Sequence, residues 1–249
     1  ENHFMKKKKT ILITGASSGI GEAIATRFSK GAYNLILTGR DKIKLQKLKI
    51  KLSKNTKSSQ LFIQANLINS KDIQSLVSIG LQKFKTIDVL INNAGIGKYT
   101  RFELSSIADF DKQIDINLRS VFLLTQEVYK IMKEQRDGHI INISSIAGVK
   151  GMAHHSMYSA TKFGVRGLGE SIAREGEEFN VRVTTICPAA VNTPYWEKNP
   201  AYSPPKGLML KSKDIANLVY YIVSLAPRVL IDEIVIRPNY CIKIAGKKR

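Results

Sequence analysis

Cysteine is almost missing from this chain of 249 residues, which contains only two. Cys187 lies in the apolar run VRVTTIC, and Cys241 stands near the carboxyl end. Two scattered cysteines cannot build a disulfide framework or a cysteine-rich zinc site. This low usage indicates a reducing compartment, and we therefore expect a cytoplasmic protein.

Long hydrophobic runs are missing as well. No apolar stretch approaches the roughly 20 residues that a membrane-spanning helix needs, so we expect no membrane association. The basic start MKKKK leads into only five residues, TILIT, before a glycine-rich turn, which is too short for the apolar region of a secretory signal. The four residues before Met5 resemble a remnant of an expression tag and are assigned no function.

Acidic residues are scarce: 20 stand against 39 lysines and arginines, which gives a net charge of +19. Such an excess is one signature of nucleic-acid binding, but specific binding needs the charge on one face, with stacking or base-reading side chains nearby. The densest basic segment, 41–57, instead interleaves seven lysines with isoleucine and leucine, as a solvated amphipathic helix does. We therefore disfavour nucleic acid as a partner and expect a surface that attracts anionic cofactors or acidic partners.

Short apolar runs rich in β-branched residues alternate with longer helical patterns between residues 10 and 240. This alternation predicts a parallel sheet with right-handed crossovers and helices on both faces. We predict one α/β domain, a doubly wound Rossmann-type fold with a mostly parallel seven-stranded sheet, between basic tails at 1–9 and 241–249. The expected strands are KTILIT, YNLILT, QLFIQ, IDVLI, GHIINIS, VRVTTI and DEIVI, and the expected helices include 20–30, 107–135 and 158–179.

Proline is concentrated in one segment, 188–211, which holds five of the seven prolines. Such a segment would be an unusually long loop without regular structure, and long loops of this kind tend to be lids or substrate-binding elements. We therefore predict that 188–211 is the substrate-binding loop.

The first expected strand ends in TGASSGIGEA, where Gly15, Gly19 and Gly21 have the spacing G-x-x-x-G-x-G before a helix. Glycines at such a point allow a tight turn and a close approach of the backbone to a pyrophosphate, which then lies at the positive end of the helix. The segment therefore predicts a dinucleotide-binding loop.

With this motif, T-G-x-x-x-G-x-G, the sequence resembles the short-chain dehydrogenase/reductase family, and the resemblance runs from Thr10 to Pro238. The family's N-N-A-G signature matches 92–95. Its catalytic residues match Asn117 in DINLRS, Ser145 in NISSIAG, and Tyr158 with Lys162 in SMYSATK. The resemblance implies an oxidoreductase with a nicotinamide cofactor.

The Tyr-x-x-x-Lys pattern alone does not select a catalytic tyrosine, because it also occurs at Tyr129/Lys133 and Tyr202/Lys206. Only Tyr158 follows a family serine at the family spacing of thirteen residues. The pair at 129 lacks a serine partner, and the pair at 202 is interrupted by two prolines. We predict that both other pairs have no catalytic role.

Reduction of a carbonyl builds negative charge on its oxygen, which requires a proton donor and a second hydrogen-bond donor. Tyr158 can give the proton, and the positive charge of Lys162 would lower the pKa of the phenol from about 10. The resemblance further implies that Lys162 holds the nicotinamide ribose, that Ser145 orients the carbonyl and that Asn117 supports a proton-relaying water.

The cofactor preference rests on the end of the second expected strand, LILTGRD. An NAD-preferring enzyme usually has a carboxylate where this chain has Gly39, and the planar donors of the following Arg40 suit a 2′-phosphate. We therefore predict NADP(H) and disfavour NAD(H), and we expect Asp41 to cap the next helix. The predicted cofactor-binding residues are Gly15, Ser17, Ser18, Gly19, Ile20, Gly21, Arg40, Asn66, Leu67, Asn93, Ala94, Gly95, Tyr158, Lys162, Pro188, Val191 and Thr193.

Two departures from the family pattern weaken individual roles. Asn66 stands where an aspartate usually meets the adenine, and Ala189 replaces a glycine beside the nicotinamide, which restricts the backbone there. The adjacent His154 and His155 would not face the same way in a helix or strand, and no zinc-like cluster surrounds them, so we expect no metal site.

The leading hypothesis is an NADP(H)-dependent oxidoreductase that interconverts a small carbonyl substrate and its alcohol. A 3-oxoacyl-[acyl-carrier-protein] reductase would profit from the basic surface, but the ending DEIVIRPNY lacks the glycine-rich terminus usual for such enzymes. A non-catalytic dinucleotide sensor or nucleic-acid-binding protein on the same scaffold would not need Tyr158. The resemblance also implies a homodimer or homotetramer.

Overall fold

The computed structural model describes residues 8–54 and 56–239. Seven strands form one sheet in the order β3-β2-β1-β4-β5-β6-β9, and all six pairings in it are parallel. The predicted seven-stranded doubly wound fold is therefore confirmed. The strands of this sheet are β1 (Thr10–Ile13), β2 (Asn34–Gly39), β3 (Ser59–Gln64), β4 (Val89–Asn92), β5 (Gly138–Ile143), β6 (Val181–Pro188) and β9 (Glu233–Ile236).

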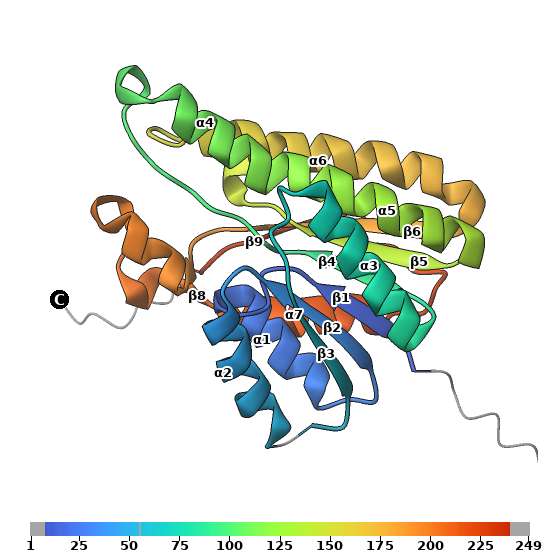
Figure 1. The fold of residues 1–249 in the computed structure, drawn as a ribbon. Helices are drawn as coiled ribbons and strands as arrows, with labels where there is room; N and C mark the ends of the chain where they lie inside the picture. Colours follow the sequence, from blue (N-terminus) through green and yellow to red (C-terminus); the bar gives the residue numbers. More distant parts are fainter. Residues whose placement is uncertain (1–7, 55, 240–249) are drawn as a thin grey trace, which may run out of the picture.

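Helices cover both faces of the sheet in two layers (Figure 1). One layer contains α1, α2 and α7, and the other contains α3, α4, α5 and α6. Their bounds are α1 (Gly19–Ser29), α2 (Lys42–Ser53), α3 (Ser70–Phe84), α4 (Ile107–Ile114), α5 (Ser120–Gln135), α6 (Ser156–Gly176) and α7 (Ser212–Ser224).

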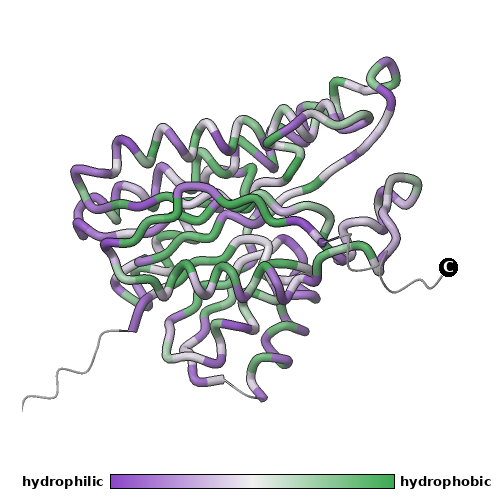
Figure 2. Tube along the Cα trace, turned by 180° about the vertical axis from the view of Figure 1, so that it is seen from behind, coloured by the Kyte–Doolittle hydropathy of each residue, from purple (hydrophilic) through white to green (hydrophobic). Residues whose placement is uncertain are grey.

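The central strands are apolar on both faces, which is why they read as continuous hydrophobic runs. In β1, Ile11 and Ile13 pack toward α1 and α7, whereas Leu12 between them packs toward α3 and α5, and all three are fully buried. Figure 2 shows the same division, with hydrophobic residues along the strands and hydrophilic residues along the outer helix faces.

The order of the strands reverses between β1 and β4, which are neighbours although β2 and β3 intervene in the sequence. The connections after these two strands leave in opposite directions, and a crevice opens beyond their carboxyl ends. The glycine loop after β1 and the segment after β4 therefore lie on either side of the position where a ligand of such a sheet binds.

A local sequence signal places the start of α2 correctly. The Asp41 carboxylate accepts a hydrogen bond from the Lys44 amide at 3.0 Å, which confirms it as the cap of α2. The predicted helix 107–135 has the right extent but is not continuous, because a π-helical turn at Asp115–Arg119 separates α4 from α5. Asn117 lies in this turn and is fully buried.

The prediction that 188–211 lacks regular structure is wrong. The segment forms a two-stranded parallel pair, β7 (Val191–Asn192) with β8 (Leu210–Lys211), and three short 3₁₀ helices. Proline opens two of these helices at their first turn, where its missing N–H costs nothing. The prolines that suggested a loop therefore start compact turns.

No helix in the described part of the chain is long and apolar enough to cross a bilayer. Residues 1–7 and 240–249, with Cys241 and most of the two predicted tails, lie outside the described residues. Cys187 is buried in β6 as a free thiol.

Candidate functional site

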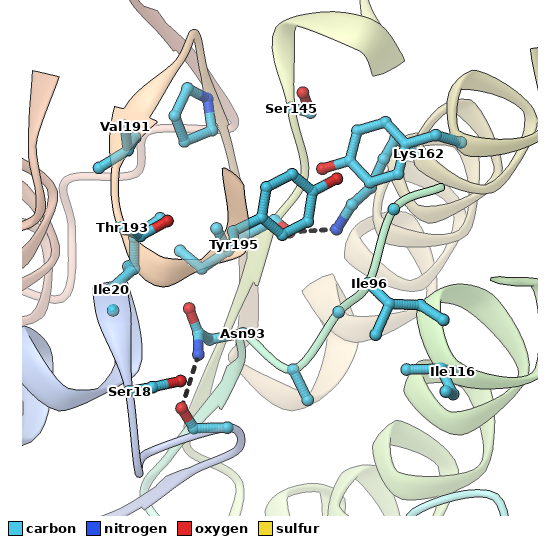
Figure 3. Close-up of a pocket in the computed structure, with 18 of the residues that line it drawn as sticks. Ser18, Ile20, Asn93, Ile96, Ile116, Ser145, Lys162, Val191, Thr193 and Tyr195 are labelled. Carbon is cyan, nitrogen blue, oxygen red and sulfur yellow. Dashed lines mark hydrogen bonds between the residues drawn. The ribbon is translucent and has the colours of Figure 1, made fainter. Parts of the chain in front are cut away.

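A cavity of about 960 Å³ lies at the carboxyl edge of the sheet, over the crevice between β1 and β4. It is lined by residues from the glycine loop, the ends of β2, β4, β5 and β6, the start of α6 and the segment 188–204. Figure 3 shows how side chains from these separate elements converge on one space. Of the predicted site residues, all line this cavity except Gly21 and Asn117.

The glycine loop is shaped by two left-handed residues, Gly15 with φ of +61° and Gly19 with φ of +57°. A Cβ on Gly15 would lie 2.9 Å from the Asn93 amide, and one on Gly19 would lie 3.2 Å from Thr193. Both positions therefore require glycine for the backbone and for space. The Asn93 amide donates to the carbonyl oxygens of Thr14 at 2.8 Å and of Gly15 at 3.3 Å, and so ties the loop to the end of β4. Figure 3 shows Asn93 beside the glycine loop.

Gly21 contributes to this loop without lining the cavity. It is buried, and a Cβ there would collide with the carbonyl oxygen of Gly15. Its role is to let the first turn of α1 pack against the loop, so the structure does not place it as a direct cofactor contact.

The end of β2 forms a basic corner of the cavity. Arg40 and Lys44 line it together, and Gly39 leaves room for the Ser17 hydroxyl, which would lie 2.9 Å from an added Cβ. Asn66 and Asp72 close the far side of this corner, where the Asp72 carboxylate accepts a hydrogen bond from the backbone N–H of Asn66 at 2.8 Å. The side chains of Arg40, Lys44 and Ser17 thus face one space that a phosphate could enter.

Ser145, Tyr158 and Lys162 meet at the opposite end of the cavity. The Ser145 hydroxyl caps the 3₁₀ turn after β5 by accepting from the Ala147 amide at 3.1 Å, and it lies near enough to Tyr158 to lower the pKa of that phenol. The Lys162 ammonium donates to the carbonyl oxygen of Ile143 at 2.9 Å and lies 5.7 Å from the centre of the Tyr158 ring (Figure 3). The predicted pair therefore shares one helix face at the cavity.

Burial dominates the protonation equilibria of this pair. Desolvation lowers the pKa of Lys162 to about 8, because the ammonium is almost completely buried. Desolvation also raises the pKa of Tyr158, while hydrogen bonds from Tyr195 and Ser145 lower it. The lysine was expected to be the main influence on the phenol, but in this structure burial and neighbouring hydroxyl groups are.

Asn117 lies beside the cavity rather than in it. Its side-chain oxygen accepts from the Ile96 amide at 2.8 Å, and its amide nitrogen donates to the Ile96 carbonyl at 2.8 Å and to the Thr161 hydroxyl at 3.1 Å. The side chain therefore fixes the segment after β4 to α6. Its predicted role through a water remains a prediction, but the geometry already assigns it a positioning role.

The residues of the two other Tyr-x-x-x-Lys pairs do not line the cavity. Tyr129 is a partly buried residue of α5 that packs against the edge of the core, and Lys133 lies over the ring of Phe179 at 4.2 Å from its centre. Residues 202 and 206 belong to two different 3₁₀ turns, so they do not share a helix face.

Several cavity residues were not predicted from the sequence. Tyr99, Tyr195 and Trp196 form an aromatic wall beside Tyr158, and His155 stacks on Tyr99 with ring centres 3.9 Å apart. They come from the loop after β4, the start of α6 and the segment after β7. No spacing links them in the sequence, and the adjacent aromatic residues Tyr195 and Trp196 beside Pro194 are the one signal that points to them.

The two histidines behave differently. His155 lines the cavity, whereas the His154 backbone has a left-handed φ of 66° and its carbonyl accepts from the Thr100 amide. Neither belongs to a group of three side chains that could hold a metal within the described residues.

Residues 9–202 match the family described as short chain dehydrogenase. The sepiapterin reductase of Chlorobaculum tepidum is 34% identical over 239 residues, which cover 93% of this chain and 97% of that protein. Among solved structures, levodione reductase superposes with a TM-score of 0.86 at 30% identity, covering 92% of this chain and 96% of the other.

Two further structures hold different cofactors. An alcohol dehydrogenase from the archaeon Thermococcus sibiricus, complexed with 5-hydroxy-NADP, has a TM-score of 0.86 at 27% identity and covers 94% and 97% of the two chains. A 3-ketoacyl-(acyl-carrier-protein) reductase from Brucella melitensis, complexed with NADH, has a TM-score of 0.83 at 30% identity and covers 92% and 96%.

Proposed function

Because the chain belongs to the short-chain dehydrogenase/reductase family, we propose that it is an NADP(H)-dependent reductase of a small carbonyl compound. One observation carries this proposal: the glycine loop and the Tyr158, Ser145 and Lys162 side chains line the same cavity. A protein that only sensed a dinucleotide would not need a proton donor at the far end of its binding site.

The residues fit a nicotinamide dinucleotide. Gly15 and Gly19 have no side chain, so the backbone of the glycine loop is accessible at the amino end of α1. The helix dipole favours a pyrophosphate at this position. Arg40 and Lys44 would face the adenosine end, and Lys162, Val191 and Thr193 the nicotinamide end. Such a cofactor supplies or takes up a hydride.

NADP(H) is favoured over NAD(H) because the described residues of the β2 corner include two cations, Arg40 and Lys44, beside the small Gly39. The carboxylate of Asp41, which could repel a phosphate, accepts the helix-capping bond from Lys44. Asp72 also borders the corner, but one oxygen of its carboxylate accepts a hydrogen bond from the backbone N–H of Asn66.

The chain's own groups account for the proton and the orientation of the substrate. The Tyr158 hydroxyl transfers its proton to the carbonyl oxygen as charge develops there, and the Ser145 hydroxyl donates a second hydrogen bond to the same oxygen. The Lys162 ammonium stabilises the phenolate that remains. Asn117 keeps Ile96 and the segment after β4 in place beside this group.

The substrate is tested by measuring NADPH oxidation with a panel of ketones, aldehydes, a pteridine ketone and 3-oxoacyl thioesters. The aromatic wall of Tyr99, Tyr195 and Trp196 favours flat or apolar ketones, so we expect these to have the highest kcat/KM. Preference for the thioester on an acidic carrier would instead support the second hypothesis. The absence of turnover with every carbonyl class, despite tight NADPH binding, would contradict the proposal.

Assembly is a separate expectation. Apolar side chains on the outer helix layer are exposed, including Phe122 on α5 at 47% and Phe163 on α6 at 42%. Figure 1 shows α5 and α6 running side by side along this layer. We expect isologous pairing through this layer and therefore a mass of two or four chains by light scattering at micromolar concentration. A monomeric mass would rule this out, and Phe122→Glu should lower the mass of an oligomer.

A further inference from the structure

Three tyrosines from distant parts of the chain meet at the reactive end of the cavity. We propose that Tyr195 is a positioning residue for the reaction: its hydroxyl donates to the phenol oxygen of Tyr158 and stabilises the phenolate left after proton transfer. The inference rests on the proposed function only in the role that it gives to Tyr158.

The three rings are in mutual contact. The ring centre of Tyr195 lies 6.1 Å from the ring centres of both Tyr99 and Tyr158, and the ring centres of Tyr99 and Tyr158 are 5.7 Å apart. The hydroxyl groups of Tyr99 and Tyr195 are hydrogen-bonded, and the Tyr195 ring packs against Tyr158 at an angle of 52°, near enough for its hydroxyl to lower the pKa of the Tyr158 phenol. In Figure 3 the Tyr195 ring lies beside the end of the Lys162 side chain. The hydroxyls thus form a chain that ends at the proton donor.

The neighbouring segments hold Tyr195 in this place. Gly97 provides the space, because a Cβ at this position would collide with the Tyr195 hydroxyl. Asn199 ties the two segments together: its amide donates to the Gly97 carbonyl at 2.9 Å, and its oxygen accepts from the Tyr99 amide at 3.1 Å. Trp196 anchors the same turn through a bond of 3.0 Å to the Val191 carbonyl.

The proton count favours one direction along the chain. Each phenol has one proton: Tyr99 donates to Tyr195 and Tyr195 donates to Tyr158, which leaves the Tyr158 proton for the carbonyl oxygen. When that proton leaves, the new phenolate still accepts from Tyr195, and a bond to a charged acceptor is stronger than one to a neutral acceptor. Tyr195 keeps its own proton, because burial raises the pKa of its phenol.

Other groups around Tyr158 stay unchanged when only the Tyr195 hydroxyl is removed. Lys162 faces it from α6, Ser145 from the turn after β5 and Tyr99 from the loop after β4. His155 stacks on Tyr99, and Cys187 of β6 lies near Lys162. The further charged groups at this end of the cavity are Lys150, Glu197 and Arg237. Replacement of Tyr195 by phenylalanine keeps the ring and all of these groups.

The direct test is a titration of the Tyr158 phenolate by ultraviolet difference absorption, with Tyr158→Phe as the reference that lacks this signal. Because Tyr195→Phe removes a donor to the phenolate, we expect its titration to move to higher pH by about one unit. Tyr99→Phe weakens the same chain at its far end and should cause a smaller shift in the same direction. Tyr129→Phe, which alters a tyrosine away from the cavity, should cause none.

Kinetics give a second measurement. In the direction of alcohol oxidation the phenolate is the active form, so the rising limb of kcat/KM against pH should move to higher pH in Tyr195→Phe. Unchanged titrations in both Tyr195→Phe and Tyr99→Phe would overturn the proposal and leave Tyr195 with a packing role. If Tyr195→Phe does not fold, Tyr99→Phe decides. If no carbonyl compound is turned over, the proposed function fails while the titration still decides the role of Tyr195.

Discussion

Tyr158→Phe is expected to lower kcat by at least about 10²–10⁴-fold, because it removes the group that protonates the carbonyl oxygen. The phenyl ring remains in place, so the cavity wall and the contact with Lys162 are preserved. Binding of NADPH should therefore stay within a few-fold of the wild type. Steady-state kinetics with the best carbonyl of the panel, together with a fluorescence titration of NADPH, measure both effects.

The chain contains a matched control for this variant. Tyr129→Phe changes the same atom in a Tyr-x-x-x-Lys pair on α5 that does not line the cavity. It should leave kcat and NADPH binding nearly unchanged. A loss of activity in Tyr129→Phe comparable with that in Tyr158→Phe would show that the wrong pair had been chosen.

Arg40→Ala is expected to weaken NADPH binding by about ten- to a hundredfold and to leave NADH binding almost unchanged. A charge-assisted pair with the 2′-phosphate contributes about 1.5–3 kcal/mol, which corresponds to that range in the dissociation constant. NADH has no phosphate at this position. Dissociation constants of both cofactors for wild type and variant, at low and moderate salt, measure the difference.

Net charge offers a competing explanation, since a chain with a charge of +19 attracts any anionic dinucleotide. It predicts small losses for both cofactors that disappear as salt is added. Lys71→Ala supplies the control, because it removes one exposed lysine that does not line the cavity. Equal losses for NADH and NADPH in Arg40→Ala would contradict the assignment of Arg40, and a wild-type preference for NADH would contradict the cofactor preference.

The sequence predicts the sheet well because each strand is a short apolar run between helical patterns, and the central strands β1, β4 and β5 are buried throughout. It also predicts that Ser145, Tyr158 and Lys162 come together, because they lie on two consecutive elements and their sequence spacing is tied to their distance in space. Both kinds of information are local.

The aromatic wall could not be found this way. Tyr99 and Tyr195 are 96 residues apart, and contacts of Asn199 and the space at Gly97 help to bring their hydroxyls together. The compact form of 188–211 was missed because its prolines suggested a loop, whereas bonds such as that from Trp196 to Val191 close it into turns. The π-helical turn at Asn117 likewise depends on contacts with Ile96 and Thr161, which no helical pattern encodes.

The buried ammonium of Lys162 also makes the folded state less stable than it would otherwise be. An exposed lysine in the unfolded chain keeps its proton up to pH of about 10.4, whereas in the folded chain the pKa is about 8. The unfolded chain therefore binds more protons between these values, so this group's contribution to the free energy of unfolding rises with pH across that window. Below pH 8 the lowered pKa of Lys162 reduces the free energy of unfolding by its full amount, about 3 kcal/mol. At neutral pH, replacement of Lys162 by a well-packed methionine should therefore give a protein that is more stable but inactive.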